Sequence, residues 1–188
     1  MENLIDEAII FAVKAHSGNT RKSEKTPYVF HPLETAHIVT SMTDDTEVIA
    51  AAVLHDVVED TKYTYDDIKT KFGKIVADMV ADETEDKMCN MPADASWKVR
   101  KEQFLENLKR ASVKAKMITL ADKLSNMRVT KRAFDEKGTN LWQGFHQKDH
   151  NIQGWYYKSI LDCISELEHT AAYKEYAELC EYVFGKNG

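Results

Sequence analysis

Apolar side chains recur three or four positions apart along most of the chain, a spacing typical of α-helices that bury one face. Thr64 and Asp67 add a capping-box pattern at the start of one such segment. Helices are therefore predicted over residues 3–16, 31–42, 46–60, 64–72, 74–84, 96–110, 112–128, 152–168 and 171–184. This pattern predicts an all-α fold, a helical bundle with about eight to ten helices.

Three connecting segments interrupt the helical spacing. Tyr28 to Phe30 is predicted to be a short extended segment that leads into His31-Pro32, because proline suits the first turn of a helix. Residues 83–94 are acidic and contain a proline, so they are predicted to form a mobile loop. Residues 129–151 show weak spacing and two glycines, and they are predicted to be a loop or a broken helix.

The length of 188 residues suits one domain around one core. The sequence contains no internal repeat, low-complexity tract or domain boundary. A single domain is therefore predicted over residues 1–188, with C-terminal helices in residues 150–185 completing the bundle.

Composition and charge narrow the classes of partner. The chain is 43% hydrophobic and 30% charged, with a net charge of -6, which disfavours nucleic acid or an anionic membrane as the partner. The 3 cysteines form no paired motif and suit a reducing compartment. No apolar run approaches the roughly 20 residues that span a bilayer. These features predict a soluble, cytoplasmic protein.

The segment from Ala50 to Thr61 joins an apolar run to a cluster of ionisable groups. His55, Asp56, Glu59 and Asp60 follow the small residues within about one helical turn. Burying these groups beside apolar neighbours is costly unless their charges are paired, and a divalent cation would pair them. The alternative is a helix end whose polar residues face water.

Two further residues complete a potential ligand set. His31 lies at a predicted helix start, and Asp122 lies in the middle of a helix that is apolar around most of its circumference. Two imidazoles and two carboxylates without a thiolate suit Mn²⁺, Fe²⁺ or Zn²⁺ at a catalytic site with open positions. Each of these residues also has a purely structural interpretation, for example an ion pair of Asp122 with Lys123. A purely structural role for all of them together is improbable.

The order His, His-Asp, Asp resembles the HD-domain phosphohydrolases, an all-helical superfamily. A narrower similarity to the hydrolase domain of RelA/SpoT-type alarmone enzymes covers roughly residues 5–130. Such domains normally precede a synthetase domain, so the chain resembles the stand-alone small alarmone hydrolases, a group that includes the metazoan SpoT homologue. The motifs that carry this similarity are Phe11-Ala12-x3-His16-x-Gly18-x2-Arg21-Lys22, Pro27-Tyr28-x2-His31-Pro32-Leu33, Leu54-His55-Asp56-Val57-Val58-Glu59-Asp60-Thr61, Phe72-Gly73 and Leu120-Ala121-Asp122-Lys123-Leu124-x-Asn126-Met127-Arg128.

The resemblance implies hydrolysis of the 3′-pyrophosphate of ppGpp or pppGpp to GDP or GTP. It implies one Mn²⁺ per chain, bound by His31, His55, Asp56 and Asp122. Glu59 and Asp60 match the pair that assists attack by water. The expected substrate contacts are Arg21 and Lys22 at the base, Asn126 at the nucleoside, and Lys87, Arg100 and Lys101 at the diphosphates.

Two alternatives stay open at this point. The base preference is undecided, because adenosine alarmones and phosphorylated nucleotides such as NADPH share the ribose and phosphate groups. The second alternative is a non-catalytic sensor that binds the alarmone without hydrolysing it. The Glu59-Asp60 pair disfavours this alternative, because a protein that only binds the alarmone needs no general base. The sequence does not decide the oligomeric state.

Overall fold

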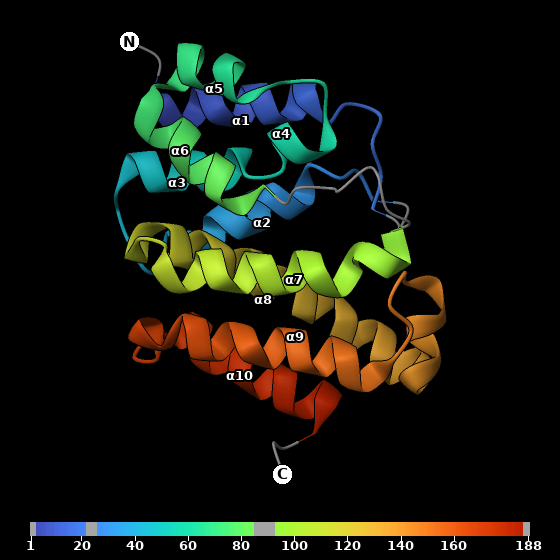
Figure 1. Cartoon of the computed structure of the whole chain (residues 1–188). Helices are drawn as coiled ribbons and strands as arrows, with labels where there is room; N and C mark the ends of the chain where they lie inside the picture. The colour runs from blue at the N-terminus through green and yellow to red at the C-terminus, as the bar shows by residue number, and fades with distance from the viewer. Residues whose placement is uncertain (1–2, 22–25, 85–92, 186–188) are drawn as a thin grey trace. The chain divides into compact units, whose positions relative to one another are not determined.

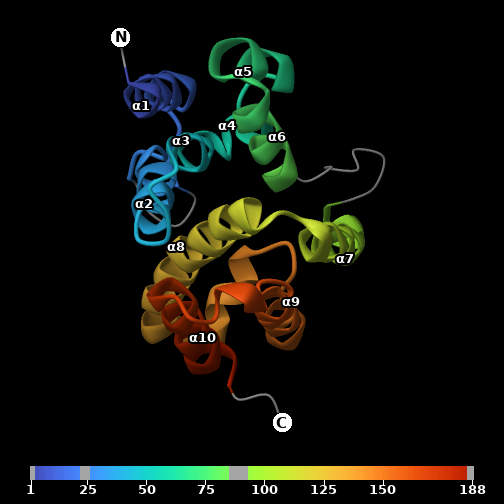
Figure 2. The ribbon, with the colours of Figure 1, turned by 90° about the vertical axis from the view of Figure 1, so that its left-hand side faces the viewer.

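The fold is helical throughout the part of the chain that the structure, a computed structural model, describes: residues 3–21, 26–84 and 93–185 (Figures 1 and 2). Within these ranges there is no β-strand, and the one β-bridge joins Thr20 to Pro27. The prediction of an all-α fold is therefore confirmed. The same ranges contain no helix long and apolar enough to cross a membrane.

The chain divides into two compact units, one formed by residues 1–84 and 112–122 and the other by residues 85–111 and 123–188. The single domain expected over residues 1–188 stays a prediction. The first unit contains α1 (Leu4–Ala15), α2 (Phe30–Val39), α3 (Thr46–Leu54), α4 (Val57–Asp60), α5 (Tyr65–Phe72), α6 (Lys74–Glu83) and the beginning of α8 (Val113–Lys137).

Helix α3 forms the centre of the first unit. It packs against α1, α2 and α6, and Figure 2 shows it between α1 and α2 on one side and α6 on the other. Every residue from Val48 to Leu54 is buried, which explains why this segment is apolar on all sides. The alanines 50–52 let neighbouring helices approach closely, so the end of α3 is fixed firmly in the core.

Side-chain caps begin several helices of this unit where the sequence predicts them. The Asp45 carboxylate accepts a hydrogen bond from the Glu47 amide at the start of α3. Thr64 and Asp67 form the predicted capping box at the start of α5. Such caps satisfy amides that the first turn leaves without a helical partner.

Two local predictions in this unit are wrong. The helix expected over residues 46–60 is interrupted at His55 and Asp56, which form a turn between α3 and α4. Tyr28 and Val29 also form a turn rather than an extended segment, with Val29 in the right-handed helical region. This turn is closed by a hydrogen bond from the His31 amide to the Tyr28 carbonyl, 2.9 Å long.

The second unit contains α7 (Ala93–Arg110), the rest of α8, the 3-10 helix η1 (Gly138–Gly144), α9 (His150–Cys163), the 3-10 helix η2 (Ser165–Leu167) and α10 (Ala171–Phe184). Helix α9 packs against both α7 and α10. The rings of Trp142 and Tyr157 each stack on Phe184, with centroids 5.5 and 5.6 Å away. Aromatic packing thus contributes to the core of this unit.

Helix α8 continues nine residues beyond the predicted end at Arg128, and a 3-10 helix follows it over Gly138–Gly144, so the segment from Val129 agrees with the broken helix rather than the loop among the two predicted alternatives. Tertiary contacts in the second unit stabilise the extension: the Arg128 guanidinium donates two hydrogen bonds of 2.7 Å to Glu175. Gly138 adopts a φ of 55° directly after the helix, a conformation that favours glycine at a helix end.

Smaller differences concern exposure and helix ends. Ile75 and Trp155 are apolar residues of the helices predicted over residues 74–84 and 152–168, and both are exposed. Helix α2 ends at Val39, three residues before the predicted end. Glu83 belongs both to the helix predicted over residues 74–84 and to the loop predicted over residues 83–94; it lies in α6 and is buried, which agrees with the helix. Residues 85–92 of the predicted loop lie outside the described part.

Candidate metal centre

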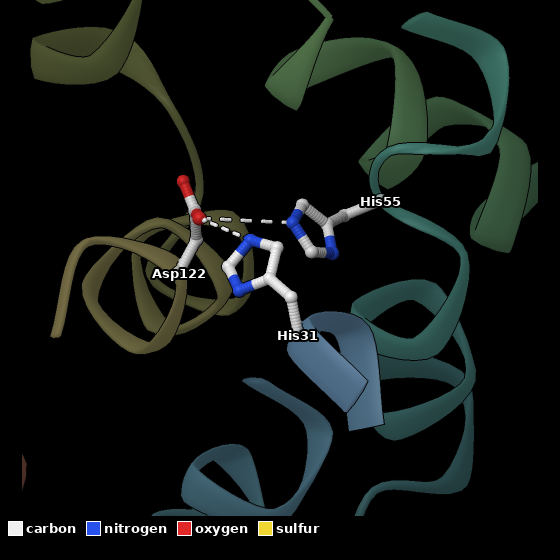
Figure 3. Close-up of side chains that lie close together, drawn as sticks. All are labelled: His31, His55 and Asp122. Atoms are coloured by element: carbon white, nitrogen blue, oxygen red, sulfur yellow. Dashed lines mark ion pairs between the residues drawn. The ribbon is translucent and has the colours of Figure 1, made fainter. Parts of the chain in front are cut away.

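Three side chains from separate helices of the first unit converge at one point (Figure 3). His31 comes from the first turn of α2, His55 from the turn after α3, and Asp122 from α8. All three are buried, and their candidate donor atoms lie within 4.8 Å of one another. Each therefore presents a nitrogen or oxygen atom to the same small volume.

Asp56 adds a second carboxylate to this cluster. The His31 Nε2 atom lies 3.0 Å from Asp122 Oδ1 and 3.5 Å from Asp56 Oδ2. The His55 Nε2 atom lies 3.1 Å from Asp56 Oδ2 and 3.7 Å from Asp122 Oδ1. The four residues expected as ligands are thus brought together, while their role as ligands stays a prediction.

The backbone of α3 orients the His55 ring. Its Nδ1 atom lies 2.9 Å from the carbonyl oxygen of Ala52. A carbonyl accepts only, so Nδ1 carries the hydrogen and Nε2 keeps its lone pair in the neutral ring. Nε2 is buried without a hydrogen-bond partner among the described residues and faces two carboxylates. Such an arrangement fits a metal ligand, whose other ring nitrogen is commonly held by a backbone carbonyl.

The electrostatics of the cluster favour a positive charge at its centre. Burial disfavours the charged imidazolium, but the carboxylates of Asp56 and Asp122 outweigh burial and raise the pKa of His55 well above its ordinary value. Burial also acts to raise the pKa of Asp56, yet the His55 and His31 rings lower it below the ordinary range. A cation between these groups would relieve the same imbalance.

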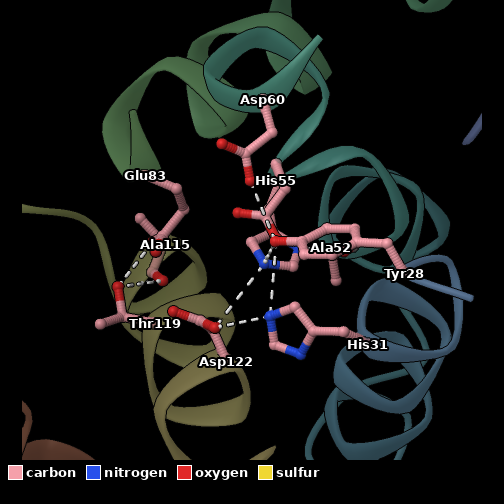
Figure 4. Close-up of polar contacts among 10 residues, drawn as sticks. Tyr28, His31, Ala52, His55, Asp60, Glu83, Ala115, Thr119 and Asp122 are labelled. Carbon is pink, nitrogen blue, oxygen red and sulfur yellow. Dashed lines mark hydrogen bonds and ion pairs between the residues drawn. The ribbon is translucent and has the colours of Figure 1, made fainter. Parts of the chain in front are cut away.

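Tyr28 is a site residue that the sequence reasoning did not assign. Its hydroxyl lies 2.6 Å from Asp56 Oδ2 and 3.0 Å from Asp60 Oδ2, and Figure 4 shows the Tyr28 side chain reaching toward Asp60 and the two histidines. Burial, followed by the charge of Asp56, raises the pKa of this phenol, so it keeps its proton. The position of Tyr28, three residues before His31, was the available signal, but a loop residue has no periodicity to reveal its partner.

Asp60 and Glu59, the expected catalytic pair, lie in the short helix α4 directly after the His55-Asp56 turn. The Asp60 amide donates to the Asp56 carbonyl, with a distance of 2.9 Å, so Asp60 lies one turn beyond Asp56. The Asp60 side chain is exposed and reaches the cluster through Tyr28, whereas Glu59 is half-buried. The turn and α4 thus present a ligand candidate and base candidates within one helical turn of each other.

A buried hydrogen bond supports the segment of α8 that carries Asp122. The Thr119 hydroxyl, about one turn earlier, donates to Glu83 of α6 with a distance of 2.5 Å (Figure 4). Both side chains are buried. A charge-assisted hydrogen bond in a buried environment restricts how α6 and this part of α8 can shift. Glu83 is another residue whose structural role the sequence pattern did not reveal.

The expected substrate-binding residues are placed less completely. Arg21 is half-buried, and its amide donates to the Thr26 carbonyl with a distance of 3.1 Å. Lys22 and Lys87 lie outside the described residues. Asn126, Arg100 and Lys101 belong to the second unit, in which the Lys101 ammonium lies over the Tyr156 ring, 4.7 Å from its centroid. All six assignments therefore stay predictions.

Comparisons with known proteins agree with this geometry. A family model described as an HD domain matches residues 8–149. Guanosine-3′,5′-bis(diphosphate) 3′-pyrophosphohydrolase MESH1 of Xenopus tropicalis is 43% identical over 136 residues, which are 71% of this chain and 73% of that protein. Bifunctional (p)ppGpp synthase/hydrolase SpoT of Escherichia coli is 37% identical over 129 residues, 65% of this chain but 17% of the longer enzyme.

A solved structure matches nearly the whole chain. It is described as a metazoan ortholog of SpoT that hydrolyzes ppGpp and plays a role in starvation responses. The two share 27% identity with a TM-score of 0.78, and the match covers 99% of this chain and 98% of the other. The chain therefore belongs to the HD-domain family, in the group of stand-alone hydrolases that includes MESH1.

Proposed function

We propose that the protein hydrolyses the 3′-pyrophosphate group of guanosine-3′,5′-bis(diphosphate) and its pentaphosphate analogue, giving GDP or GTP and pyrophosphate. The observation that carries this proposal is the convergence of His31, His55 and Asp122 in a chain that is 43% identical to a MESH1 hydrolase. The reaction uses a small nucleotide, which suits a cytoplasmic enzyme. Nucleic acid is not a partner in this proposal, in keeping with the net charge of -6.

We assign one Mn²⁺ to the four residues His31, His55, Asp56 and Asp122. The unpartnered Nε2 of His55 supports this assignment, and nitrogen and oxygen donors without thiolate suit Mn²⁺. When bound, the ion would acidify a water and offset phosphate charge. Asp122 and Asp56 would balance the charge of the ion, while the Ala52 carbonyl keeps the lone pair of His55 directed inward.

Glu59 and Asp60 would act as the bases of the reaction. Water attacks the phosphorus attached to the 3′ oxygen, the bond between them breaks, and the oxygen leaves with the ribose. The attacking water loses a proton, which a carboxylate one turn beyond Asp56 is placed to accept. The departing 3′ oxygen gains a proton, so the protonated carboxylate can return one and restore the starting state.

Cationic side chains would hold the substrate in an acidic protein. We assign Arg21 and Lys22 to the faces of the purine, because a planar guanidinium stacks well on an aromatic ring. Asn126 would contact the nucleoside, and Lys87, Arg100 and Lys101 would offset the diphosphate charges. The contacts with the purine and the nucleoside, unlike the metal ligands, would determine which base is accepted.

The decisive experiment is incubation of the purified protein with guanosine-3′,5′-bis(diphosphate) and Mn²⁺, with pyrophosphate and GDP measured separately. We expect equal amounts of both products and complete loss of activity with excess EDTA. Restoration by Mn²⁺, Zn²⁺ or Mg²⁺, each added alone, identifies the preferred ion. Release of single orthophosphates would contradict the proposed reaction and indicate a general nucleotide phosphatase.

A substrate panel tests the base preference in the same assay. Adenosine-3′,5′-bis(diphosphate) carries the same ribose and diphosphate groups as the proposed substrate and would release pyrophosphate. NADPH carries a single phosphate on a ribose 2′ oxygen, so its hydrolysis is followed as NADH and orthophosphate. A higher kcat/KM for either one would show that the purine contacts favour a different nucleotide. Tight binding of the guanosine compound without any product would instead identify the protein as a sensor.

A further inference from the structure

The Tyr28 hydroxyl lies between two carboxylates that have different proposed roles. It is 2.6 Å from Asp56 Oδ2, a proposed metal ligand, and 3.0 Å from Asp60 Oδ2, a proposed base. Both distances are within the range of hydrogen bonds from a hydroxyl. Tyr28 therefore connects the two carboxylates through a single oxygen atom.

The hydroxyl has one hydrogen to donate, so it can bond fully to only one carboxylate at a time. The shorter distance identifies Asp56 as the main acceptor, with Asp60 held at the second position. Two carboxylates near each other repel, and a shared donor reduces that repulsion. Loss of this donor would remove a contact that holds the exposed Asp60 side chain near Asp56.

The Tyr28 ring is well placed to hold its hydroxyl still. Its centroid lies 5.0 Å from that of the buried His16 ring and 5.9 Å from that of His31. Its amide donates to the Asn19 carbonyl with a distance of 2.9 Å, and its carbonyl accepts from the His31 amide. Backbone and ring are thus both restrained, which is what a positioning group requires.

We propose that Tyr28 is a positioning residue that holds the Asp60 carboxylate beside the metal centre by bridging it to Asp56. This inference rests on the proposed hydrolase function and deepens it. Tyr28 does not touch the substrate in this scheme. It keeps the base near the attacking water, so its contribution is made in the transition state rather than in substrate binding.

The substitution Tyr28→Phe removes the hydroxyl and keeps the ring. We expect kcat to fall about 10- to 100-fold, the usual effect of losing a hydrogen bond to a charged group, while KM and Mn²⁺ content change less than about threefold. Tyr65→Phe is the matched control in the same unit, because the Tyr65 hydroxyl donates to Asp78 with a distance of 2.7 Å and Tyr65 is not among the site residues. Its kcat should equal that of the wild type. A Tyr28→Phe enzyme with unchanged kcat would overturn the proposal.

A double-mutant cycle separates positioning of Asp60 from other effects. If Tyr28 acts through Asp60, then Tyr28→Phe should lower kcat less than about threefold in an Asp60→Asn background, because the base is already disabled. An equal loss in both backgrounds would show that Tyr28 acts through another group. The melting temperatures of the four proteins check that each one is folded.

Crystal structures of wild type and Tyr28→Phe, both loaded with Mn²⁺, give a readout independent of turnover. We expect the Asp60 carboxylate to leave its position near Asp56 in the variant while the metal ligands stay in place. An unmoved Asp60 would overturn the positioning role even if the wild type hydrolysed the alarmone normally. A displaced Asp60 in an enzyme without alarmone hydrolysis would support the positioning role and refute only the proposed substrate.

Discussion

The two units use histidines in opposite ways. In the second unit, His150 Nδ1 accepts a hydrogen bond of 2.9 Å from the Trp142 indole, and its ring stacks on Phe134. In the first unit, the Nε2 atoms of His31 and His55 face the carboxylates of Asp56 and Asp122. The same side chain is satisfied by packing in one unit and directed at a charged cluster in the other.

This difference shows where the fold buries polar groups at a cost in stability. The half-buried His150 imidazole, which accepts from a neutral donor, stabilises its surroundings. A buried imidazole before two carboxylates is stable only when a proton or a metal ion lies between them. The first unit therefore places the charges of this cluster at a position where a ligand can offset them, as expected for a functional site.

Among the substitutions considered, that of Asp122 should have the largest effect on metal binding and hydrolysis. Asp122→Ala removes a buried carboxylate that balances the cation, so Mn²⁺ binding and hydrolysis should both be lost, with activity down at least about 10⁴-fold. The matched control is Asp135→Ala on the same helix, where the exposed carboxylate bonds to Lys131 and Tyr182. Metal content measured by elemental analysis should be normal in Asp135→Ala. A normal content in Asp122→Ala would contradict its role as a ligand.

Substitution of Glu59 separates the proposed base from the ligands. Glu59→Gln keeps the shape of the side chain and all four ligand candidates, so metal should still bind while kcat falls roughly 10²- to 10⁴-fold. Calorimetric titration with Mn²⁺ and steady-state kinetics on the same preparation check both quantities. If Glu59→Gln lost its metal but worked normally after refilling, Glu59 would be a ligand.

Substitution of Arg21 should affect substrate binding rather than turnover. Arg21→Ala is expected to raise KM by the equivalent of about 1–3 kcal/mol, because a stacking cation acts similarly in the ground and transition states. Lys22→Ala should have a smaller effect, since an ammonium stacks less well than a guanidinium. An unchanged KM in both variants would show that this loop does not hold the purine.

The affinity for Mn²⁺ should increase with pH. The carboxylates raise the pKa of His55, so at neutral pH a proton competes with the metal for this ring. Below that pKa, each pH unit upward should strengthen binding by about tenfold for the single proton released. Calorimetry in buffers of different ionisation enthalpy counts this proton. Binding that weakened with rising pH would contradict the competition.

The same pKa shifts determine how the stability of the metal-free protein depends on pH. The raised pKa of His55 contributes stability below its ordinary value, and this is lost as pH rises through the folded-state value. The lowered pKa of Asp56 contributes stability above its ordinary value, and this is lost as pH falls through the folded-state value. Denaturant unfolding of metal-free protein at several pH values measures both losses.

Substitution of His150 should have the smallest effect and no effect on metal. His150→Ala leaves the buried Trp142 indole without its acceptor, so the free energy of unfolding should fall by about 1–2 kcal/mol. Mn²⁺ content should stay normal, whereas His31→Ala should lose metal. Denaturant unfolding and elemental analysis on the two variants test this contrast. Loss of metal in His150→Ala would show that the two units do not divide these roles.

Sequence patterns predicted most helices because periodicity records which face each helix buries. The buried run before His55 and the capping box at Thr64 are local features, and both were predicted correctly. The extension of α8 was missed because its stability comes from distant partners such as Glu175. The exposure of Ile75 has a related cause: an apolar residue in a helix is buried only if a neighbour covers it.

The sequence by itself determined the helical class and the types of side chain available for the site. It also determined that His55 and Asp56 are adjacent, because neighbouring residues cannot separate. Only the tertiary structure brought Asp122 within 3.0 Å of His31 Nε2 and connected Tyr28 to Asp56 and Asp60. The physical reason is that periodicity describes one helix at a time, whereas a site depends on how several helices pack.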